Sequence, residues 1–193
     1  MKLLRGFALS EGHAFLEKVA EIAARAPFRH LVTPGGHRMS VAMTNCGALG
    51  WVSDRTGYRY EANDPGSGRR WPRMPGNFLR LAGEAAAQAG FGGFVPDACL
   101  INRYASGARL SLHQDEGDPA APIVSVSFGV AAVFLLGGLK RSDKTERILL
   151  EHGDVVVLGG EARMRFHGVL ALKRQFHPLT GKQRINLTFR KAG

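Results

Sequence analysis

The sequence predicts a mainly β protein of the α+β class, in which two helices precede an antiparallel β-sandwich or jelly roll. Three observations lead to this prediction. Residues 98–191 contain eight short β-prone stretches, separated by Gly, Pro or charged residues. Two stretches with apolar residues at helical spacing come before them. Neither a strand–helix alternation typical of parallel sheets nor a glycine motif that cradles phosphate is present.

The first helix is expected over residues 11–25, with Ser10 as its N-cap and Pro27 after its end. The second is expected over 76–89 and is ended by Gly90. Their apolar faces consist of Phe15, Val19 and Ile22 in the first helix and Phe78, Leu81, Ala82 and Ala85 in the second.

The segment between the helices, residues 28–72, mixes short β-prone pieces with many Gly, Pro and Asn residues. We therefore expect it to form hairpins and loops rather than core, and loops of this kind often carry recognition. It interleaves aromatic and basic side chains, which are Trp51, Tyr58, Tyr60 and Trp71 among Arg38, Arg55, Arg59, Arg69 and Arg70.

The eight strands follow, and no internal repeat or linker interrupts the chain, so we expect residues 1–193 to form a single domain. The strands are expected at 98–105, 109–115, 123–129, 131–138, 147–153, 154–160, 163–169 and 184–191.

The charge, hydropathy and cysteine content of the chain limit the partners and the compartment that we expect for it. The 26 Lys and Arg against 16 Asp and Glu give a net charge of +10, which favours polyanions, nucleic acid first; general solubility is the plainer explanation. No apolar run approaches the roughly 20 residues that span a bilayer. Glu11 and His13 come too early for a signal peptide. Two cysteines imply no disulfide framework, so a cytoplasmic protein is expected.

The stretch "LSLHQDE" places His113 and Asp115 two residues apart, and such residues share one face of a strand. A non-haem Fe(II) oxygenase centre needs two His and one carboxylate, with the remaining metal positions open. The second His must come from another strand. His167, at the end of a strand, is best placed, but His13, His30, His37, His152 and His177 remain candidates. A His-x-Asp pair also occurs by chance in many proteins.

The last strand, "QRINLTFRK", alternates strictly. Its apolar residues, Ile185, Leu187 and Phe189, are expected to pack between the sheets. The polar face could be an ordinary solvated face, or its two arginines could clamp a dicarboxylic ligand, because guanidinium pairs with carboxylate through two parallel hydrogen bonds. That face consists of Arg184, Asn186, Thr188 and Arg190, and "LINRYA" likewise puts Asn102 and Tyr104 on one face.

Long stretches of the chain resemble the bacterial AlkB family of Fe(II)- and 2-oxoglutarate-dependent dioxygenases, which repair alkylated nucleic acid. The resemblance covers nearly the whole chain. It is carried by "PFRHLVTPGGHRMSVAMTNCGALGW", "PDACLINRYASGARLSLHQDE", "APIVSVSFG", "GGLKR", "LLEHGDVVV", "FHGV" and "FHPLTGKQRINLTFR". It implies a double-stranded β-helix (jelly-roll) catalytic core over 98–191 and a nucleotide-recognition lid over 28–72.

The resemblance also implies roles for particular residues. Iron would lie on His113, Asp115 and His167. The distal carboxylate of 2-oxoglutarate would lie on Arg190, with further contacts from Asn102, Tyr104, Arg184 and Asn186. The substrate residues would be Thr33, Met43, Trp51, Tyr58 and Arg141, with Trp51 stacked on the damaged base opposite the His113 ring.

The activity so implied uses Fe(II), O2 and 2-oxoglutarate, which is decarboxylated to succinate. Bases such as 1-methyladenine and 3-methylcytosine would lose the alkyl group, releasing formaldehyde from a methyl. The partners would be alkylated single- or double-stranded DNA, with RNA as an alternative, and the protein is expected to be a monomer.

Three features depart from the family pattern. Gly117 stands where bacterial relatives carry an acid two residues after the metal Asp, and Leu158 stands where a Trp is expected. The amino terminus is shorter, which leaves open whether a first strand is present. The first departure bears on which lesion the protein prefers.

Three alternatives stay open. The same centre could hydroxylate a protein or a small molecule, although the basic, aromatic front segment argues against it. The protein could instead be a nucleic-acid-binding module with an idle metal site, or a jelly-roll binder without iron. Decarboxylation of 2-oxoglutarate would separate the first alternative from the other two.

Overall fold

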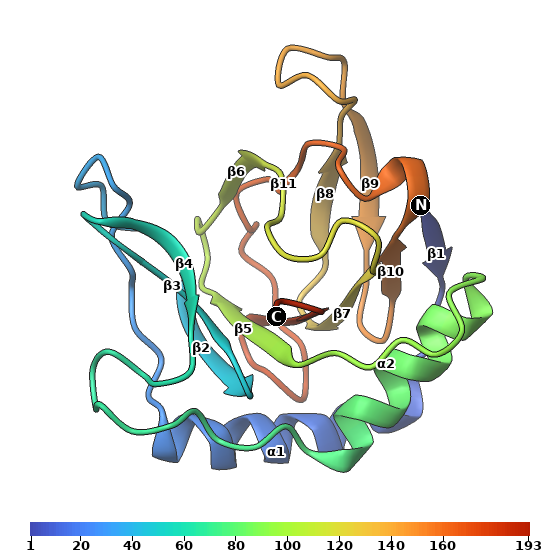
Figure 1. Cartoon of the computed structure of the whole chain (residues 1–193). Coiled ribbons are helices and arrows are strands. Elements are labelled where there is room, and N and C mark those ends of the chain that lie inside the picture. Colours follow the sequence, from blue (N-terminus) through green and yellow to red (C-terminus); the bar gives the residue numbers. More distant parts are fainter.

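The computed structural model describes all 193 residues and contains two facing β-sheets with two helices against one of them (Figure 1). The helices are α1 (Gly12–Arg25) and α2 (Gly76–Gln88), with short 3-10 turns η1 (Leu9–Glu11) and η2 (Gly160–Ala162). Neither α-helix is long and apolar enough to cross a membrane.

The larger sheet has six strands in the order β1-β10-β7-β12-β5-β2. These strands are β1 (Lys2–Leu4), β10 (Val155–Leu158), β7 (Ile123–Gly129), β12 (Arg184–Arg190), β5 (Ala98–Tyr104) and β2 (Ala42–Gly47). All its neighbouring strands are antiparallel. A first strand is therefore present, at the edge beside β10.

The smaller sheet has four antiparallel strands in the order β6-β11-β8-β9. They are β6 (Leu110–His113), β11 (His167–Val169), β8 (Ala132–Leu136) and β9 (Glu146–Leu150). The eight strands expected from the sequence are thus all present as β5 to β12. They alternate between the two sheets except for β8 and β9, which pair with each other in the smaller sheet, and this order gives the jelly roll.

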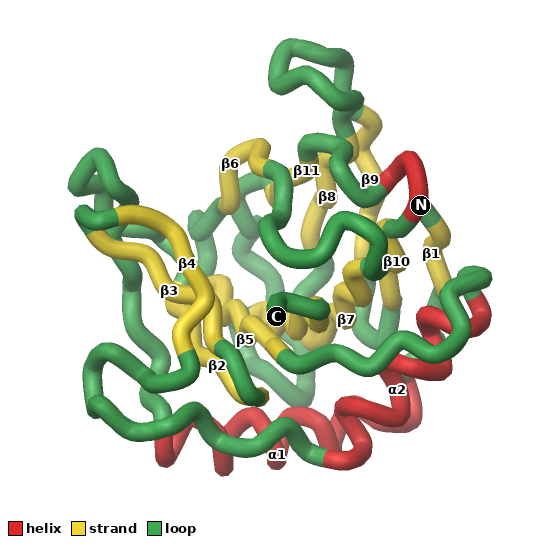
Figure 2. Tube along the Cα trace, viewed as in Figure 1, coloured by secondary structure: helices red, strands yellow, loops and turns green.

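The helices cover the outer face of the larger sheet (Figures 1 and 2). Phe15 of α1, Phe78 of α2 and Phe189 of β12 belong to one buried cluster, and the Phe15 and Phe78 rings stack 4.4 Å apart. The expected helix ranges and apolar faces are confirmed. Ser10 does not cap α1, because it lies inside η1 and α1 begins at Gly12 without a side-chain cap.

The segment between the helices is only partly loop. Its β3 (Gly50–Asp54) and β4 (Gly57–Glu61) form a hairpin apart from both sheets, as expected. The expectation that the segment contributes nothing to the core is wrong, because β2 pairs with β5 along its whole length and Ala42 to Cys46 are all buried. The apolar pieces are short, but one of them completes the edge of the larger sheet.

Candidate functional site

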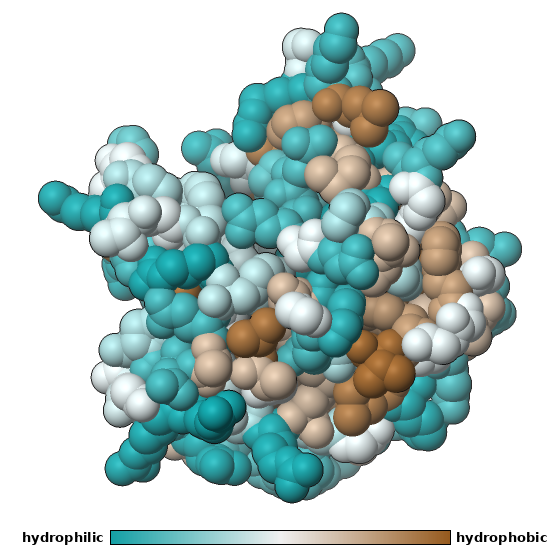
Figure 3. All heavy atoms as spheres, in the orientation of Figure 1, coloured by the Kyte–Doolittle hydropathy of each residue, from teal (hydrophilic) through white to brown (hydrophobic).

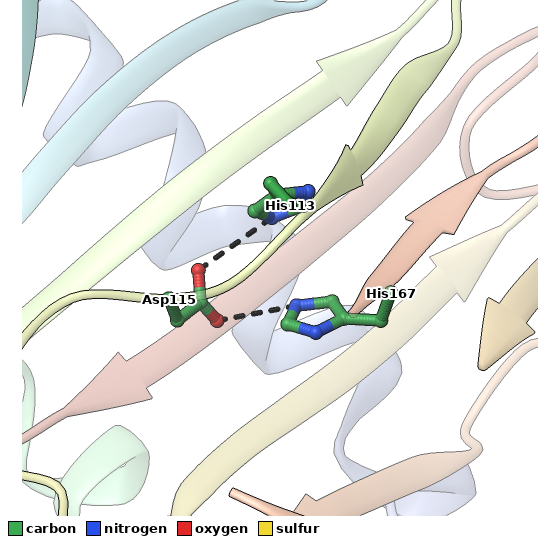
Figure 4. Close-up of side chains that lie close together, drawn as sticks. All are labelled: His113, Asp115 and His167. Carbon is green, nitrogen blue, oxygen red and sulfur yellow. Dashed lines mark ion pairs between the residues drawn. The ribbon is translucent and has the colours of Figure 1, made fainter. Parts of the chain in front are cut away.

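The three candidate metal ligands meet between the two sheets. His113 Nε2 lies 3.6 Å from Asp115 Oδ1, and His167 Nε2 lies 3.4 Å from Asp115 Oδ2. All three ligand atoms lie within 4.8 Å of one another. Figure 4 shows both rings directed at the carboxylate. Two imidazoles and one carboxylate on one side of a common point are the donor set of non-haem Fe(II) centres.

Both imidazoles are held with the same nitrogen facing the centre. His113 Nδ1 lies 2.8 Å from the Ser111 carbonyl oxygen, and His167 Nδ1 lies 3.0 Å from that of Arg165. A carbonyl oxygen only accepts, so each Nδ1 carries the proton and donates it. Each Nε2 therefore presents a lone pair to the centre, which is the tautomer that a metal ligand needs.

The strands position the two histidines but not the aspartate. β6 ends at His113, and His167 is the first residue of β11, directly opposite His113 in the register. The expected strand ranges of 109–115 and 163–169 are therefore too long: the first strand ends at residue 113, and the second begins only at 167, after a turn at 163–164 and two residues without regular structure. Asp115 lies beyond the strand, in the loop that leads to β7.

Asp115 is buried and paired with a cation. Arg190 Nη2 donates to Asp115 Oδ1 over 2.6 Å. Burial alone would raise the pKa of this carboxyl, but the positive charge of Arg190 holds the pKa well below its usual value. Asp115 is thus an anion at neutral pH, as a metal ligand must be.

The polar face of β12 is buried rather than solvated. Arg184 is 2% exposed and Arg190 is 5% exposed, and both line a cleft between the sheets. The apolar face packs on the helices, not between the sheets. The two faces of β12 therefore point opposite to the directions expected from the sequence. The apolar face packs against α1 and α2, and the space between the two sheets is left free for a polar site.

Arg184 keeps hydrogen-bonding capacity that the chain does not use. Its Nη2 donates to Ser127 Oγ over 3.0 Å, and its guanidinium lies over the Tyr104 ring at 5.1 Å. Its Nε and Nη1 are buried without a partner. Burial lowers the pKa of Arg184, as expected for a guanidinium without a carboxylate partner. A buried cation with two free donors fits one carboxylate of a dicarboxylic acid.

The cleft itself has a volume of about 1110 Å³ and opens beside the segment 33–58. It is lined by every residue that the family resemblance assigns to the metal, to 2-oxoglutarate or to the substrate. These are His113, Asp115 and His167; Asn102, Tyr104, Arg184, Asn186 and Arg190; and Thr33, Met43, Trp51, Tyr58 and Arg141. In Figure 3 the lobe with β3 and β4 and the lobe with β6 both present mostly hydrophilic residues.

At the mouth of the cleft, Trp51 of β3 stacks on Tyr58 of β4, with ring centroids 5.6 Å apart and an interplanar angle of 16°. Asn45 fixes the Trp51 backbone through two hydrogen bonds of 3.0 Å. On the opposite side, the Arg141 guanidinium donates to the Leu112 carbonyl and lies 5.0 Å from the Phe166 ring. Met43 is 3% exposed, so its side chain is a packed part of the cleft wall.

Gly117 and Leu158, the two residues that depart from the family pattern, both line the cleft. Gly117 has φ +107°, and a Cβ there would lie 2.8 Å from the Lys191 carbonyl oxygen. The position is therefore unsuited to any side chain. Leu158 is 2% exposed and forms part of the wall.

Arg163 is a residue that the sequence analysis missed. It is 1% exposed, and its guanidinium binds the backbone of the loop that carries Asp115. A single basic residue beside a turn has no spacing that distinguishes it from a surface arginine, so only the fold reveals it.

Comparisons with known proteins agree with this geometry. The model of the 2OG-Fe(II) oxygenase superfamily matches residues 1–190. The chain is 57% identical to the alpha-ketoglutarate-dependent dioxygenase AlkB of Salmonella typhimurium, over 98% of this chain and 89% of that protein. It is 56% identical to the Escherichia coli protein of the same name, over 99% and 89%.

A solved structure titled "The structure of OsALKBH1" matches with a TM-score of 0.82 and 26% identity, over 98% of this chain and 97% of that one. The chain therefore belongs to the 2OG-Fe(II) oxygenase superfamily, and within it to the AlkB dioxygenases, whose cofactors Fe(II), 2-oxoglutarate and O2 are those of this enzyme.

Proposed function

We propose that this dioxygenase removes alkyl groups from nucleic-acid bases by oxidation and so repairs alkylated DNA. The observation that carries the proposal is the His113, Asp115 and His167 cluster inside a cleft whose mouth holds a stacked Trp51 and Tyr58. Relatives support it by their names, which include the nucleic acid dioxygenase ALKBH1 of Mus musculus, 35% identical over 63% of this chain.

In this proposal, His113, Asp115 and His167 hold the iron. Bound iron and 2-oxoglutarate supply the oxidation: O2 is consumed, 2-oxoglutarate is cleaved to succinate and CO2, and an oxygen atom enters a C–H bond of the alkyl group. The hydroxylated group then leaves as an aldehyde, which is formaldehyde from a methyl. The chain's task is to orient the reactants and keep bulk water away from them.

We assign the distal carboxylate of 2-oxoglutarate to Arg184 rather than to Arg190, which the family resemblance had suggested. Arg184 has two buried unpartnered donors, whereas Arg190 already gives hydrogen bonds to Asp115 and to the Tyr60 hydroxyl. Arg190 would keep Asp115 ionised and oriented, and its one nitrogen without a partner, Nε, leaves room for a second contact. Asn102, Tyr104 and Asn186 would complete the pocket.

Recognition of the base would fall to the mouth of the cleft. A base in a duplex must leave the stack, which costs a few kcal/mol and costs less where a lesion already prevents pairing. Stacking on an aromatic ring is worth about 1–3 kcal/mol per base. Stacking on Trp51, with His113 opposite and Thr33, Met43, Tyr58 and Arg141 around it, would therefore offset extrusion of a damaged base better than of a sound one.

Charge would supply the remaining affinity. The net charge of +10 suits a polyanion, and Arg38, Arg109 and Arg141 line the cleft where a phosphate backbone would pass. Both cysteines are free, which suits the cytoplasm. Action as a monomer and alkylated single- or double-stranded DNA as the partner, with RNA as an alternative, stay predictions, as do the substrates 1-methyladenine and 3-methylcytosine. Gly117 stands where the family resemblance implies an acid, so we expect the preference between these two substrates to differ from the family pattern.

The test is incubation with Fe(II), 2-oxoglutarate, ascorbate and an oligonucleotide containing one 1-methyladenine or 3-methylcytosine. We expect formaldehyde and succinate, with recovery of the unmethylated oligonucleotide by mass. The Asp115→Ala variant should form neither product. Succinate without formaldehyde from any methylated nucleic acid would point to a different substrate class, and neither product from iron-loaded protein would contradict the proposal.

A further inference from the structure

Arg163 is a buried cation without an acidic partner. It lies at the C-terminal end of η2, is 1% exposed, and has no carboxylate oxygen within 4.0 Å. Burial lowers the pKa of Arg163, and the negative charge of Asp115 opposes that shift. Burying a charge without an ion pair is costly, so the contacts that compensate for it indicate what the residue does.

Apart from a contact of Nη1 with Met164 Sδ at 3.8 Å, those contacts all go to one loop. Arg163 Nε donates to the Ala121 carbonyl over 3.1 Å, Nη1 to that of Asp115 over 3.0 Å, and Nη2 to that of Glu116 over 3.2 Å. No nitrogen of Arg163 is left unpartnered, in contrast to Arg184. Every nitrogen of the Arg163 guanidinium is therefore engaged by the chain itself.

Besides the Arg190 ion pair with the Asp115 carboxylate, few main-chain contacts fix the loop that Arg163 holds. β6 ends at His113, and residues 114–117 make no backbone–backbone hydrogen bond outside the sheets. The first such bond after them is from Asp118 N to the Lys191 carbonyl. The Gln114 side chain donates to the Met164 carbonyl over 2.5 Å, so it too ties the loop to the η2 end.

Arg163 also lies on the segment that leads into His167. Arg163 is four residues before that ligand, and the Arg165 carbonyl between them accepts the hydrogen bond from His167 Nδ1. The guanidinium thus joins the backbone of Asp115 to the segment that orients His167.

We propose that Arg163 is a positioning residue for the metal centre: by donating hydrogen bonds to three carbonyls of the loop 115–121, it holds the Asp115 carboxylate in position beside His167. The proposal rests on the proposed ligands His113, Asp115 and His167. Side chains that orient metal ligands typically change metal affinity by about 10–100-fold when they are replaced. Arg163 would act in the same way through the main chain.

The experiment is a Co2+ titration of the metal-free full-length protein, followed by the visible absorption of the bound ion, together with urea unfolding of each metal-free variant. In Arg163→Met we expect Co2+ to bind at least about 10-fold more weakly. In Arg163→Lys, which can still donate to part of the loop, we expect a smaller loss with an altered absorption spectrum. Arg5→Lys is the matched control, because Arg5 also donates to a main-chain carbonyl, that of Leu149, but away from the cleft.

The outcomes separate this inference from the proposed function. If wild type binds Co2+ and Asp115→Ala does not, the ligand set stands. Arg163 variants that then fold but bind Co2+ as tightly as wild type, with the same spectrum, overturn the positioning role. If Arg163→Met does not fold, the Arg163→Lys variant decides: weaker Co2+ binding with an altered spectrum supports the positioning role, and wild-type affinity with the wild-type spectrum overturns it.

Discussion

His113 and His167 are direct cross-strand partners at the ends of β6 and β11, with ring centroids 4.5 Å apart. Residues opposite each other in an antiparallel pair share a face, so the register alone turns both rings into the cleft. Two rigid strands thereby fix two of the three proposed metal ligands. The third, Asp115, depends on side-chain contacts from Arg163 and Arg190, and this division underlies the predictions below.

The two arginines of β12 should differ in what they bind. We expect Arg184→Met to raise the 2-oxoglutarate concentration for half-maximal turnover at least about 30-fold, because loss of one partner of a buried charge pair costs about 2–5 kcal/mol. Arg190→Met should instead weaken metal retention, since it frees Asp115. Steady-state kinetics and metal titration of both variants check this. If the 2-oxoglutarate concentration for half-maximal turnover rises more in Arg190→Met than in Arg184→Met, then Arg190 binds the distal carboxylate instead.

Trp51 should serve the base and not the cosubstrate. We expect Trp51→Ala to raise the KM for methylated oligonucleotide about 5–150-fold, which corresponds to the roughly 1–3 kcal/mol of one base stack. Turnover of 2-oxoglutarate without nucleic acid should stay the same, and Trp51→Phe should keep most of the affinity. Equal losses in both reactions would mean that Trp51 supports the fold instead.

Restoring an acid at position 117 should cost stability. We expect Gly117→Asp to lower the free energy of unfolding by at least about 1–3 kcal/mol, because φ is +107° and the new Cβ would meet the Lys191 carbonyl. Gly181→Asp is the control, since its φ of +63° is also positive but nothing lies within 4 Å of a Cβ there. Urea unfolding measures both. Equal stability of Gly117→Asp and wild type would show that the loop can rearrange.

Acid should destabilise the protein through His152, on the side away from the cleft. Burial and the stacked ring of His177, 4.4 Å away, hold the pKa of His152 below its usual 6.5. The Gly129 N–H also donates to His152 Nδ1, a bond that protonation at this nitrogen would break. The unfolded chain therefore binds the proton more readily, and stability falls as the pH drops through about 6.5 toward the folded pKa.

Urea unfolding from about pH 8 to about pH 5 tests this, and we expect a shallower loss of stability in His152→Gln than in wild type. His13→Gln, which removes an exposed histidine of α1, should follow wild type. A His152→Gln profile that coincides with wild type would exclude His152 as the source.

Much of the fold could be predicted because its patterns are local. The alternation in β12 identified both faces of that strand, and the apolar spacing of α1 and α2 identified their buried sides. What the alternation could not reveal is the direction of each face. Because α1 and α2 pack on the outer side of the larger sheet, the apolar face of β12 points toward them and its polar face points into the cleft between the sheets.

The candidate site was predictable in its residue types but not in its supports. His113, Asp115 and the arginines of β12 stand in recognisable spacings, and the family resemblance selected His167 among six histidines. The end of β6 at His113 depends on pairing with β11, which no local pattern shows. Arg163 acts through main-chain carbonyls, and these are the same in every sequence, so its role depends wholly on tertiary contact.

The most direct test of the account is a crystal structure of the protein with Mn2+ and 2-oxoglutarate. We expect the anomalous signal of one metal ion bound by His113 Nε2, Asp115 and His167 Nε2, and 2-oxoglutarate with its distal carboxylate on Arg184. A metal ion bound elsewhere, or 2-oxoglutarate outside the cleft, would contradict it.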